Sequence, residues 1–386
     1  MEFEYWWLLA FPLFFALGWL AARIDIRQVV TESRTVPNSY FRGLNFLLNE
    51  QPDKAIEAFI EVARLDPETI DLHFALGGLF RKRGEVDRAI RMHENLLERE
   101  TLDPENRLRA LAELGQDYLK AGLLDRAEEV FQRLLKTSHE GMARQSLLEI
   151  YVQEKDWQKA IEAAEVLDKQ SAKPMSAEIA HFYSELALLD AVKGDSAAAH
   201  KHLQQALEIN RQSVRANMML GDLESAAGRH EEAIKYWRQV EAQSPGHMVL
   251  IVDKLLASFR AMGKIDDGLA WLLGILARHA SLGLFNTLYA ATLESQGAEA
   301  AIQLARTELR RHPSLSALER LAEAELIRAP EERRELLQSA KSLLQSHNQK
   351  LMRYHCTGCG FKARQFFWRC PACGRWDSFD PERSEE

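Results

Sequence analysis

The four cysteines of the chain form two pairs near its C-terminal end, Cys356-Thr-Gly-Cys359-Gly and Cys370-Pro-Ala-Cys373-Gly. In each pair the two-residue gap lets the backbone turn so that both sulfur atoms face one point, and the glycine that follows lets backbone N–H groups point at sulfur. Four thiolates around one point suit a tetrahedral divalent ion, with Zn²⁺ favoured and iron as the alternative. The spacing therefore predicts one metal ion, held by Cys356, Cys359, Cys370 and Cys373.

Other uses of these cysteines fit the sequence less well. A redox motif of the thioredoxin type needs a βαβ context that is missing here, and a disulfide framework is disfavoured in a reducing compartment. The pairs resemble the knuckles of rubredoxin and of zinc ribbons. Because only ten residues separate Cys359 from Cys370, fewer than in rubredoxins, we favour a structural or docking role over electron transfer. So short a domain depends on its ion for folding.

The segment around the cysteines is aromatic and basic. Its aromatic side chains, some of which we expect to pack on the last helices of the chain, are Phe361, Phe366, Phe367, Trp368 and Trp376. No acidic residue occurs from Lys341 to Trp376, but seven basic ones do: Lys341, Lys350, Arg353, Lys362, Arg364, Arg369 and Arg375. Four thiolates on a divalent ion balance only part of this charge. The remainder suits an acidic protein surface, anionic lipid or nucleic acid; since the net charge of the whole chain is -8, we rank protein and lipid headgroups first and expect no nucleic acid partner.

An internal repeat occupies the middle of the chain. An alanine marker recurs with gaps of 34, 38, 33, 39, 34 and 68 residues, at Ala55, Ala89, Ala127, Ala160, Ala199, Ala233 and Ala301. A small or apolar residue stands twelve positions before most markers, a large residue often stands four positions after, and glycines stand at the predicted turns: Gly84, Gly122, Gly194, Gly228, Gly263 and Gly297. The pattern resembles the tetratricopeptide repeat, whose period is 34 residues, and markers in phase disfavour an unrelated α-helical domain. We predict repeats over residues 36–313 and capping helices, or a ninth unit, over residues 314–349.

Partner binding in such an array occurs on the concave surface, which the first helix of each unit lines. The exposed positions predicted to form this groove are Arg81, Lys82, Arg109, Gln116, Lys120, His181 and Arg215. Units two and three are basic and would suit an acidic or extended partner segment.

The N-terminal segment is predicted to anchor the chain in a membrane. Tyr5–Ala22 contains no charged residue, and a helix of that length covers about 27 Å, close to the hydrocarbon core of a bilayer. Acidic residues precede the span and arginines follow it, which places the N-terminus outside and the bulk of the chain in the cytoplasm. A cleaved signal peptide would need a basic start, and a buried core helix is the remaining alternative.

The sequence contains no motif of an enzyme. Phosphate-binding loops, dinucleotide fingerprints, nucleophile elbows and the HExxH zinc motif are all missing, and few strands are expected. With 46% hydrophobic and 27% charged residues, the chain is foldable. We predict an all-α, non-enzymatic protein: a tetratricopeptide-repeat superhelix with an N-terminal transmembrane helix and a small C-terminal rubredoxin-like zinc ribbon.

The full order is a transmembrane anchor at 1–22, a linker at 23–35, repeats, a cap, a ribbon at 350–380 and an acidic tail at 381–386. The chain closely resembles the lipopolysaccharide assembly protein B family of Gram-negative bacteria. The resemblance lies in this order of segments, in the opening EFEYWWLLAFPLFFALGW and in the closing HCTGCGFKARQFFWRCPACGRWD. The resemblance implies a single-pass inner-membrane adaptor that helps the membrane protease FtsH degrade the deacetylase LpxC and so restrains lipopolysaccharide synthesis. Lipopolysaccharide and other envelope proteins are further candidate partners, and an assembly scaffold without a proteolytic role is the alternative function.

Overall fold

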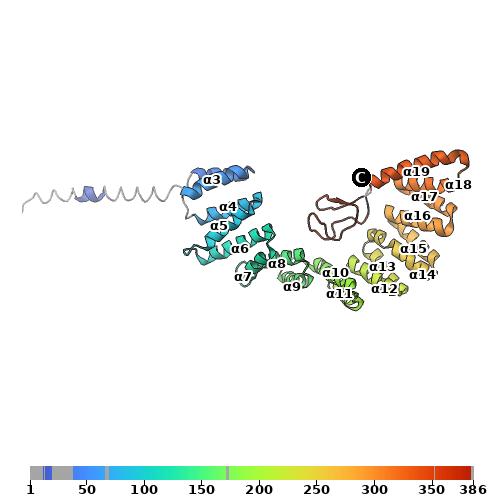
Figure 1. The fold of residues 1–386 in the computed structure, drawn as a ribbon, viewed down its shortest axis with the longest axis horizontal. Helices are drawn as coiled ribbons and strands as arrows, with labels where there is room; N and C mark the ends of the chain where they lie inside the picture. The colour runs from blue at the N-terminus through green and yellow to red at the C-terminus, as the bar shows by residue number, and fades with distance from the viewer. Residues whose placement is uncertain are drawn as a thin grey trace, which may run out of the picture. The chain divides into compact units, whose positions relative to one another are not determined.

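The structure of the chain is a computed structural model that describes residue 12 and residues 14–19, 38–65, 69–170, 174–351 and 353–383. The chain folds into two compact units, Met1–Glu154 and Lys155–Glu386. The described part is almost entirely helical, with a single two-stranded sheet at the C-terminal end (Figure 1). The predicted all-α architecture is therefore confirmed.

The first unit is a series of antiparallel helices. They are α2 (Asn38–Leu48), α3 (Pro52–Leu65), α4 (Ile70–Arg83), α5 (Val86–Leu97), α6 (Pro104–Ala121), α7 (Leu124–Leu134) and α8 (Glu140–Glu154). Neighbouring helices pack in pairs, with α2 on α3, α4 on α5 and α6 on α7.

The second unit continues the same pattern and ends in the ribbon. Its helices are α9 (Trp157–Gln170), α10 (Ser176–Lys193), α11 (Ser196–Ile209), α12 (Val214–Ala226), α13 (His230–Gln243), the 3₁₀ helix η2 (Pro245–Leu250), α14 (Val252–Ala261), α15 (Ile265–Arg278), α16 (Leu282–Gln296), α17 (Ala298–Arg311), α18 (Leu315–Arg328) and α19 (Glu331–Leu351). The antiparallel strands β1 (Tyr354–His355) and β2 (Lys362–Ala363) follow. The segment predicted as a cap thus forms α18 and α19, which pack on each other as a further helix pair.

Local sequence sets where the helices begin and end. Ser213, Ser281 and Ser314 each accept a hydrogen bond from the backbone N–H three residues ahead, which caps α12, α16 and α18. All six glycines predicted at turns have a positive φ. At Gly84, for example, φ is 87° and the glycine N–H bonds to the carbonyl of Arg81, which closes α4.

The repeat markers meet inside each helix pair. All seven marker alanines are fully buried. A Cβ atom built on Gly43 would lie 2.4 Å from the ring of Phe59, and one built on Gly221 would lie 2.2 Å from the ring of Trp237. The glycine of the first helix therefore makes room for the large side chain of the second helix.

One described stretch belongs to the predicted membrane anchor. Residues 14–19 are helical, and Phe14, Phe15 and Leu17 are exposed. The rest of Tyr5–Ala22, apart from Pro12, and the predicted linker at 23–35 lie outside the described residues. Within the part that the structure describes, no helix combines the length and the apolarity that crossing a membrane requires.

Two adjacent glycines of α4 provide a test of the packing rule. A Cβ atom on Gly77 would lie 2.3 Å from Nε2 of His93, whereas a Cβ atom on Gly78 would meet nothing within 4 Å. We expect Gly77→Ala to lower the free energy of unfolding by about 1–3 kcal/mol because the core is overpacked. Gly78→Ala should raise it by up to about 1 kcal/mol through helix propensity. Urea unfolding followed by circular dichroism measures both; equal shifts would contradict the packing rule.

Candidate metal centre and its docking surface

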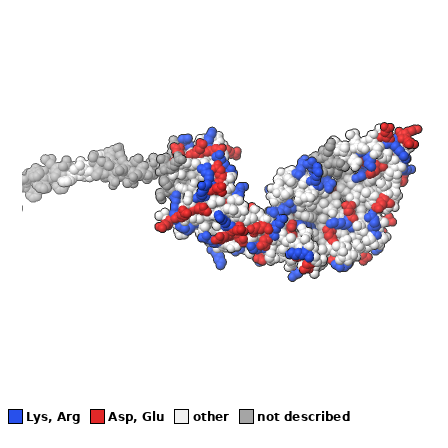
Figure 2. All heavy atoms as spheres, in the orientation of Figure 1, with Lys and Arg blue, Asp and Glu red and all other residues white. Residues whose placement is uncertain are grey.

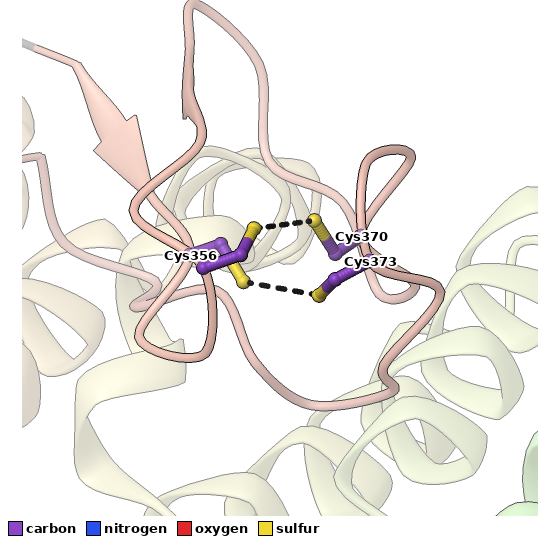
Figure 3. A group of neighbouring side chains, drawn as sticks. Cys356, Cys370 and Cys373 are labelled. Carbon is purple, nitrogen blue, oxygen red and sulfur yellow. Dashed lines mark hydrogen bonds between the residues drawn. The ribbon is translucent and has the colours of Figure 1, made fainter. Parts of the chain in front are cut away.

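The four predicted ligand cysteines converge on one point. Their sulfur atoms all lie within 4.8 Å of one another. The Sγ atoms of Cys356 and Cys373 are 3.8 Å apart and those of Cys359 and Cys370 are 3.7 Å apart (Figure 3). These distances are too long for disulfide bonds, which are ~2.05 Å. A tetrahedral ion with metal–sulfur bonds of about 2.3 Å places its sulfurs about 3.8 Å apart, so the donor set fits one tetrahedral ion.

The two cysteine knuckles have the same backbone geometry. The N–H of Cys356 donates to the carbonyl of Phe361, and the N–H of Gly360 donates back to the carbonyl of Cys356. In the second knuckle Cys370 and Gly374 form the equivalent bonds, Cys370 to Arg375 and Gly374 to Cys370. The glycines have φ of 75° and 71°, which a residue with a side chain rarely adopts. Each knuckle is therefore a tight loop that presents two sulfurs together.

The electrostatics of the cluster favour a bound cation. The hydroxyl of Ser378 and the backbone N–H groups of Gly358 and Cys359 lower the pKa of the Cys356 thiol to about 6. For Cys359 the backbone N–H of Phe361 lowers the pKa, but loss of hydration and the neighbouring sulfurs together raise it to about 12. The Cys356 thiolate therefore forms readily, and its negative charge opposes the ionisation of the neighbouring thiols. A divalent ion at the centre removes this conflict.

Around the knuckles, the ribbon has a small core of its own. Tyr354, Cys356, Cys370 and Phe379 are buried together, and Ala363, Phe366 and Phe367 pack against them. Strands β1 and β2 pair Tyr354 with Ala363 and His355 with Lys362. This core is too small to hold the fold alone, so we expect the ribbon to depend on a metal ion at the four sulfurs and on its contacts with the helices.

The ribbon docks on the inner side of the helices of the second unit (Figure 1). The ring of Trp376 stacks on His181 of α10 with centroids 4.6 Å apart and lies edge-on to Trp157 of α9. Oδ2 of Asp377 lies 2.8 Å from Nε2 of His181. Trp368 stacks on His247 of η2 at 5.4 Å, and burial there lowers the pKa of His247.

The residues after the ribbon make a third attachment. The carboxylate of Glu382 accepts hydrogen bonds from the hydroxyl of Ser281 and the N–H of Gly283, at the start of α16. Burial raises the pKa of Glu382, and these two hydrogen bonds oppose the shift. Our expectation that the ribbon aromatics dock on the last helices was wrong, because Trp376 and Trp368 pack on α9, α10 and η2, in the middle of the repeats.

Two predicted groove residues lie beneath the ribbon. His181 and Arg215 are buried, with exposures of 4% and 6%. The guanidinium of Arg215 lies 5.8 Å from the ring centroids of both Trp368 and Trp376 and forms an ion pair with Glu185. We predicted both residues as exposed groove positions, and the exposure is wrong, because the chain's own ribbon covers them. Partner binding by them stays a prediction.

Four other predicted groove residues come together in the first unit. Arg81, Lys82, Gln116 and Lys120 line one hollow of about 580 Å³, together with Leu119, Glu149 and Gln153. Arg81 forms ion pairs there with Glu113 and Asp117, so Lys82 and Lys120 supply the positive charge. Arg109 lies in a neighbouring hollow, where it pairs with Asp71 and covers the ring of Phe74.

His93, which was not predicted from the sequence, lies beneath this hollow and supports it through Asp117. Its ring is fully buried, and Nδ1 lies 2.5 Å from Oδ2 of Asp117, whose other oxygen accepts from Arg81 at 2.7 Å. His93 stands four residues after the marker Ala89, as Phe59 does after Ala55. Counting from the marker would have placed it in the core, and its polar ring would have indicated a buried partner.

Family models and whole-chain comparisons agree with this architecture. The rubredoxin metal binding domain matches residues 354–381, and tetratricopeptide repeat models match residues 72–108, 112–174 and 185–247. Lipopolysaccharide assembly protein B of Escherichia coli (strain K12) is 34% identical over 379 residues, which is 97% of each chain. The chain belongs to the lipopolysaccharide assembly protein B family.

Other proteins are similar to a smaller degree. Lipopolysaccharide assembly protein B of Haemophilus influenzae is 29% identical and covers 98% of each chain. Among solved structures, the MamA protein is 22% identical, covers 44% of this chain and 94% of its own, and superimposes with a TM-score of 0.30.

Removing two of the four sulfur ligands tests whether the ribbon needs a metal ion to fold. We expect the double variant Cys356→Ser with Cys359→Ser to lose the metal, because two ligands cannot complete a tetrahedral site. A structural tetrathiolate site contributes roughly 10 kcal/mol to folding, so the ribbon should unfold and expose Trp368 and Trp376. Metal analysis and tryptophan fluorescence measure both effects.

The matched control is Ala372→Ser, which adds a serine to the second knuckle and leaves all four sulfurs. It should keep the metal and the fluorescence of the unaltered chain. A double variant without metal whose fluorescence is unchanged would show that the ribbon folds and docks without its ion.

Proposed function

We propose that this protein is a non-enzymatic adaptor of the inner membrane that acts in lipopolysaccharide assembly by presenting the deacetylase LpxC to the membrane protease FtsH. The match over 97% of the chain to a protein named for lipopolysaccharide assembly supports the general role in that process. The choice of FtsH as the protease and of LpxC as the client follows from the family resemblance. Three features of the chain support the mechanism: an apolar N-terminal segment, an open hollow in the first unit and a ribbon that docks on its own repeats.

The apolar segment Tyr5–Ala22 would serve as the tether. Its described residues 14–19 are helical and carry exposed aromatic and aliphatic side chains, as a lipid-facing helix does. A single-pass span with its N-terminus in the periplasm would confine the repeats to the cytoplasmic surface. Confinement beside a membrane protease raises the effective concentration of the adaptor without any new contact.

The hollow at Lys82 and Lys120 is where we place the client. Both lysines stand free of ion pairs among the described residues, and the amide groups of Gln116 and Gln153 lie beside them. The lining also contains Glu149, which accepts a hydrogen bond from Gln153. Amides bond to an extended backbone and ammonium groups attract carboxylates. The hollow therefore suits an extended segment with acidic side chains.

The buried histidine–carboxylate pairs support a role without catalysis. His93 and Asp117 form the kind of pair that serves as a general base in enzymes, but both side chains are 0% exposed. His181 is covered by Trp376. The pair of His93 and Asp117 is therefore closed to a substrate in this conformation and acts as a packing and orienting group. The partner of His181, Asp377, is half exposed and serves to dock the ribbon.

Zinc is the metal that we assign to the ribbon. It has no redox chemistry and prefers a closed tetrahedral site, as a purely structural role requires. We expect the purified full-length protein to be colourless and to contain one equivalent of zinc by metal analysis. A red protein with visible thiolate-to-iron absorption would show that the bound metal is iron and not zinc.

Reversing the charge of the hollow tests the client site and the adaptor role together. We expect the double variant Lys82→Glu with Lys120→Glu to slow the decay of LpxC by roughly tenfold, since like charges now face the client segment and each 1.4 kcal/mol of lost binding is tenfold. The measurement is the half-life of LpxC in cells that carry only the variant, after protein synthesis is stopped.

The matched control reverses two exposed lysines outside the hollow, Lys169→Glu with Lys201→Glu, and should leave the half-life unchanged. Equal decay in both variants would remove the hollow from the mechanism. If deleting the whole protein also left the half-life of LpxC unchanged, the assembly scaffold without a proteolytic role would replace the adaptor.

A further inference from the structure

A second, strongly basic hollow lies within the second unit, between the ribbon and the last helices. It has a volume of about 450 Å³ and is lined by four arginines, Arg320 of α18 and Arg353, Arg364 and Arg383 of the ribbon and its tail. Figure 2 shows Lys and Arg side chains gathered on the ribbon, in the region where Figure 1 draws it. Neither the metal nor the docking of Trp368 and Trp376 uses this hollow.

The sheet register places two of these charges side by side. Tyr354 pairs with Ala363 at one end of the two-stranded sheet, and Arg353 and Arg364 are the residues next to this pair along the chain, so both arginines lie at that end of the sheet and both line the hollow. Like charges held close together repel each other. Within the described part of the chain, no carboxylate forms an ion pair with Arg353, Arg364 or Arg383. An anion bound between the two guanidinium groups would remove the repulsion.

The floor of the hollow is already organised. Arg320 donates from Nε to Oδ1 of Asn286 at 2.9 Å and forms an ion pair with Glu323, which also binds Lys341. Glu319 is the only carboxylate among the lining residues, and it accepts a hydrogen bond from Asn348 at 2.6 Å. The guanidinium of Arg320 is thus fixed before any ligand arrives, which lowers the entropic cost of binding.

One buried acceptor in the lining has no partner. The side chain of Asn348 is 5% exposed, and its Oδ1 atom has no hydrogen-bond partner in the described structure. A buried acceptor without a donor costs about 1–3 kcal/mol. The hollow therefore combines several guanidinium donors with one acceptor that lacks a donor.

We propose that this hollow binds a phosphate monoester. Its oxygens match the paired N–H groups of Arg353 and Arg364, and a protonated phosphate oxygen or an adjoining hydroxyl would donate to Asn348. The group comes either from a lipid headgroup or from a soluble phosphorylated metabolite. The site is independent of the client hollow in the first unit, and it accounts for basic residues that the metal charge leaves unbalanced.

Calorimetric titration of the full-length protein in an uncharged detergent tests the site. The probes are inorganic phosphate and glycerol 3-phosphate, with chloride at equal ionic strength as the reference. We expect both phosphates, and not chloride, to bind the unaltered protein. The double variant Arg353→Ala with Arg364→Ala should bind them at least roughly tenfold more weakly, because two charge-assisted donor pairs are lost.

The matched control, Arg310→Ala with Arg333→Ala, removes two exposed arginines outside the hollow and should bind as the unaltered protein does. Unchanged metal content in the Arg353 and Arg364 variant shows that the ribbon is intact. Arg353→Lys with Arg364→Lys, which keeps the charge but loses the planar fork, should restore only part of the affinity. Equal binding by all variants, or no binding of phosphate above chloride, would overturn the proposal.

Vesicles distinguish the two sources. Sedimentation of the protein with phosphatidylcholine vesicles that contain phosphatidic acid, compared with phosphatidylcholine alone, measures headgroup binding. If the double variant loses this sedimentation, the phosphate belongs to a lipid. If sedimentation is the same for both proteins while glycerol 3-phosphate still distinguishes them, the ligand is a soluble ester.

Discussion

Four sulfur atoms around one point determine how the second unit of this protein is built. The two knuckles that present them bring Trp368 and Trp376 to the surface of the ribbon, and those rings stack on His247 and His181 of the repeats. The ribbon core is small, and its cysteine charges repel one another without a cation. A bound ion would therefore stabilise the ribbon, and the ribbon in turn packs on helices α9, α10 and η2.

This arrangement divides the two units by role. In the second unit the inner surface, where tetratricopeptide repeats hold partners, is occupied by the chain's own ribbon through Trp376, Asp377 and Glu382. In the first unit the hollow at Lys82 and Lys120 is open. The first unit is thus the part that we assign to a client, and the ribbon stiffens the second. Both roles fit an adaptor in which binding surfaces, and no reactive groups, carry the function.

The sequence predicted what depends on local spacing. The four ligand cysteines, the helix pairs and the glycine turns follow from periodic patterns, and the structure bears them out. Docking could not be predicted, because Trp376 and His181 are far apart in the sequence and no pattern links them. The hollow lined by Arg353 and Arg364 depends on a strand register only two pairs long. His93 was missed although its position is periodic, since the pattern predicts only a large residue there and says nothing of a polar ring.

Hydrogen exchange with and without the ion tests most directly whether the metal holds the ribbon against the repeats. Amide exchange would be followed by mass spectrometry on the full-length protein before and after a chelator removes the metal. The account predicts that protection falls together in the ribbon and in α10 and η2, while α4 to α6 of the first unit are unchanged. Loss of protection in the ribbon alone, with α10 and η2 as protected as before, would contradict it.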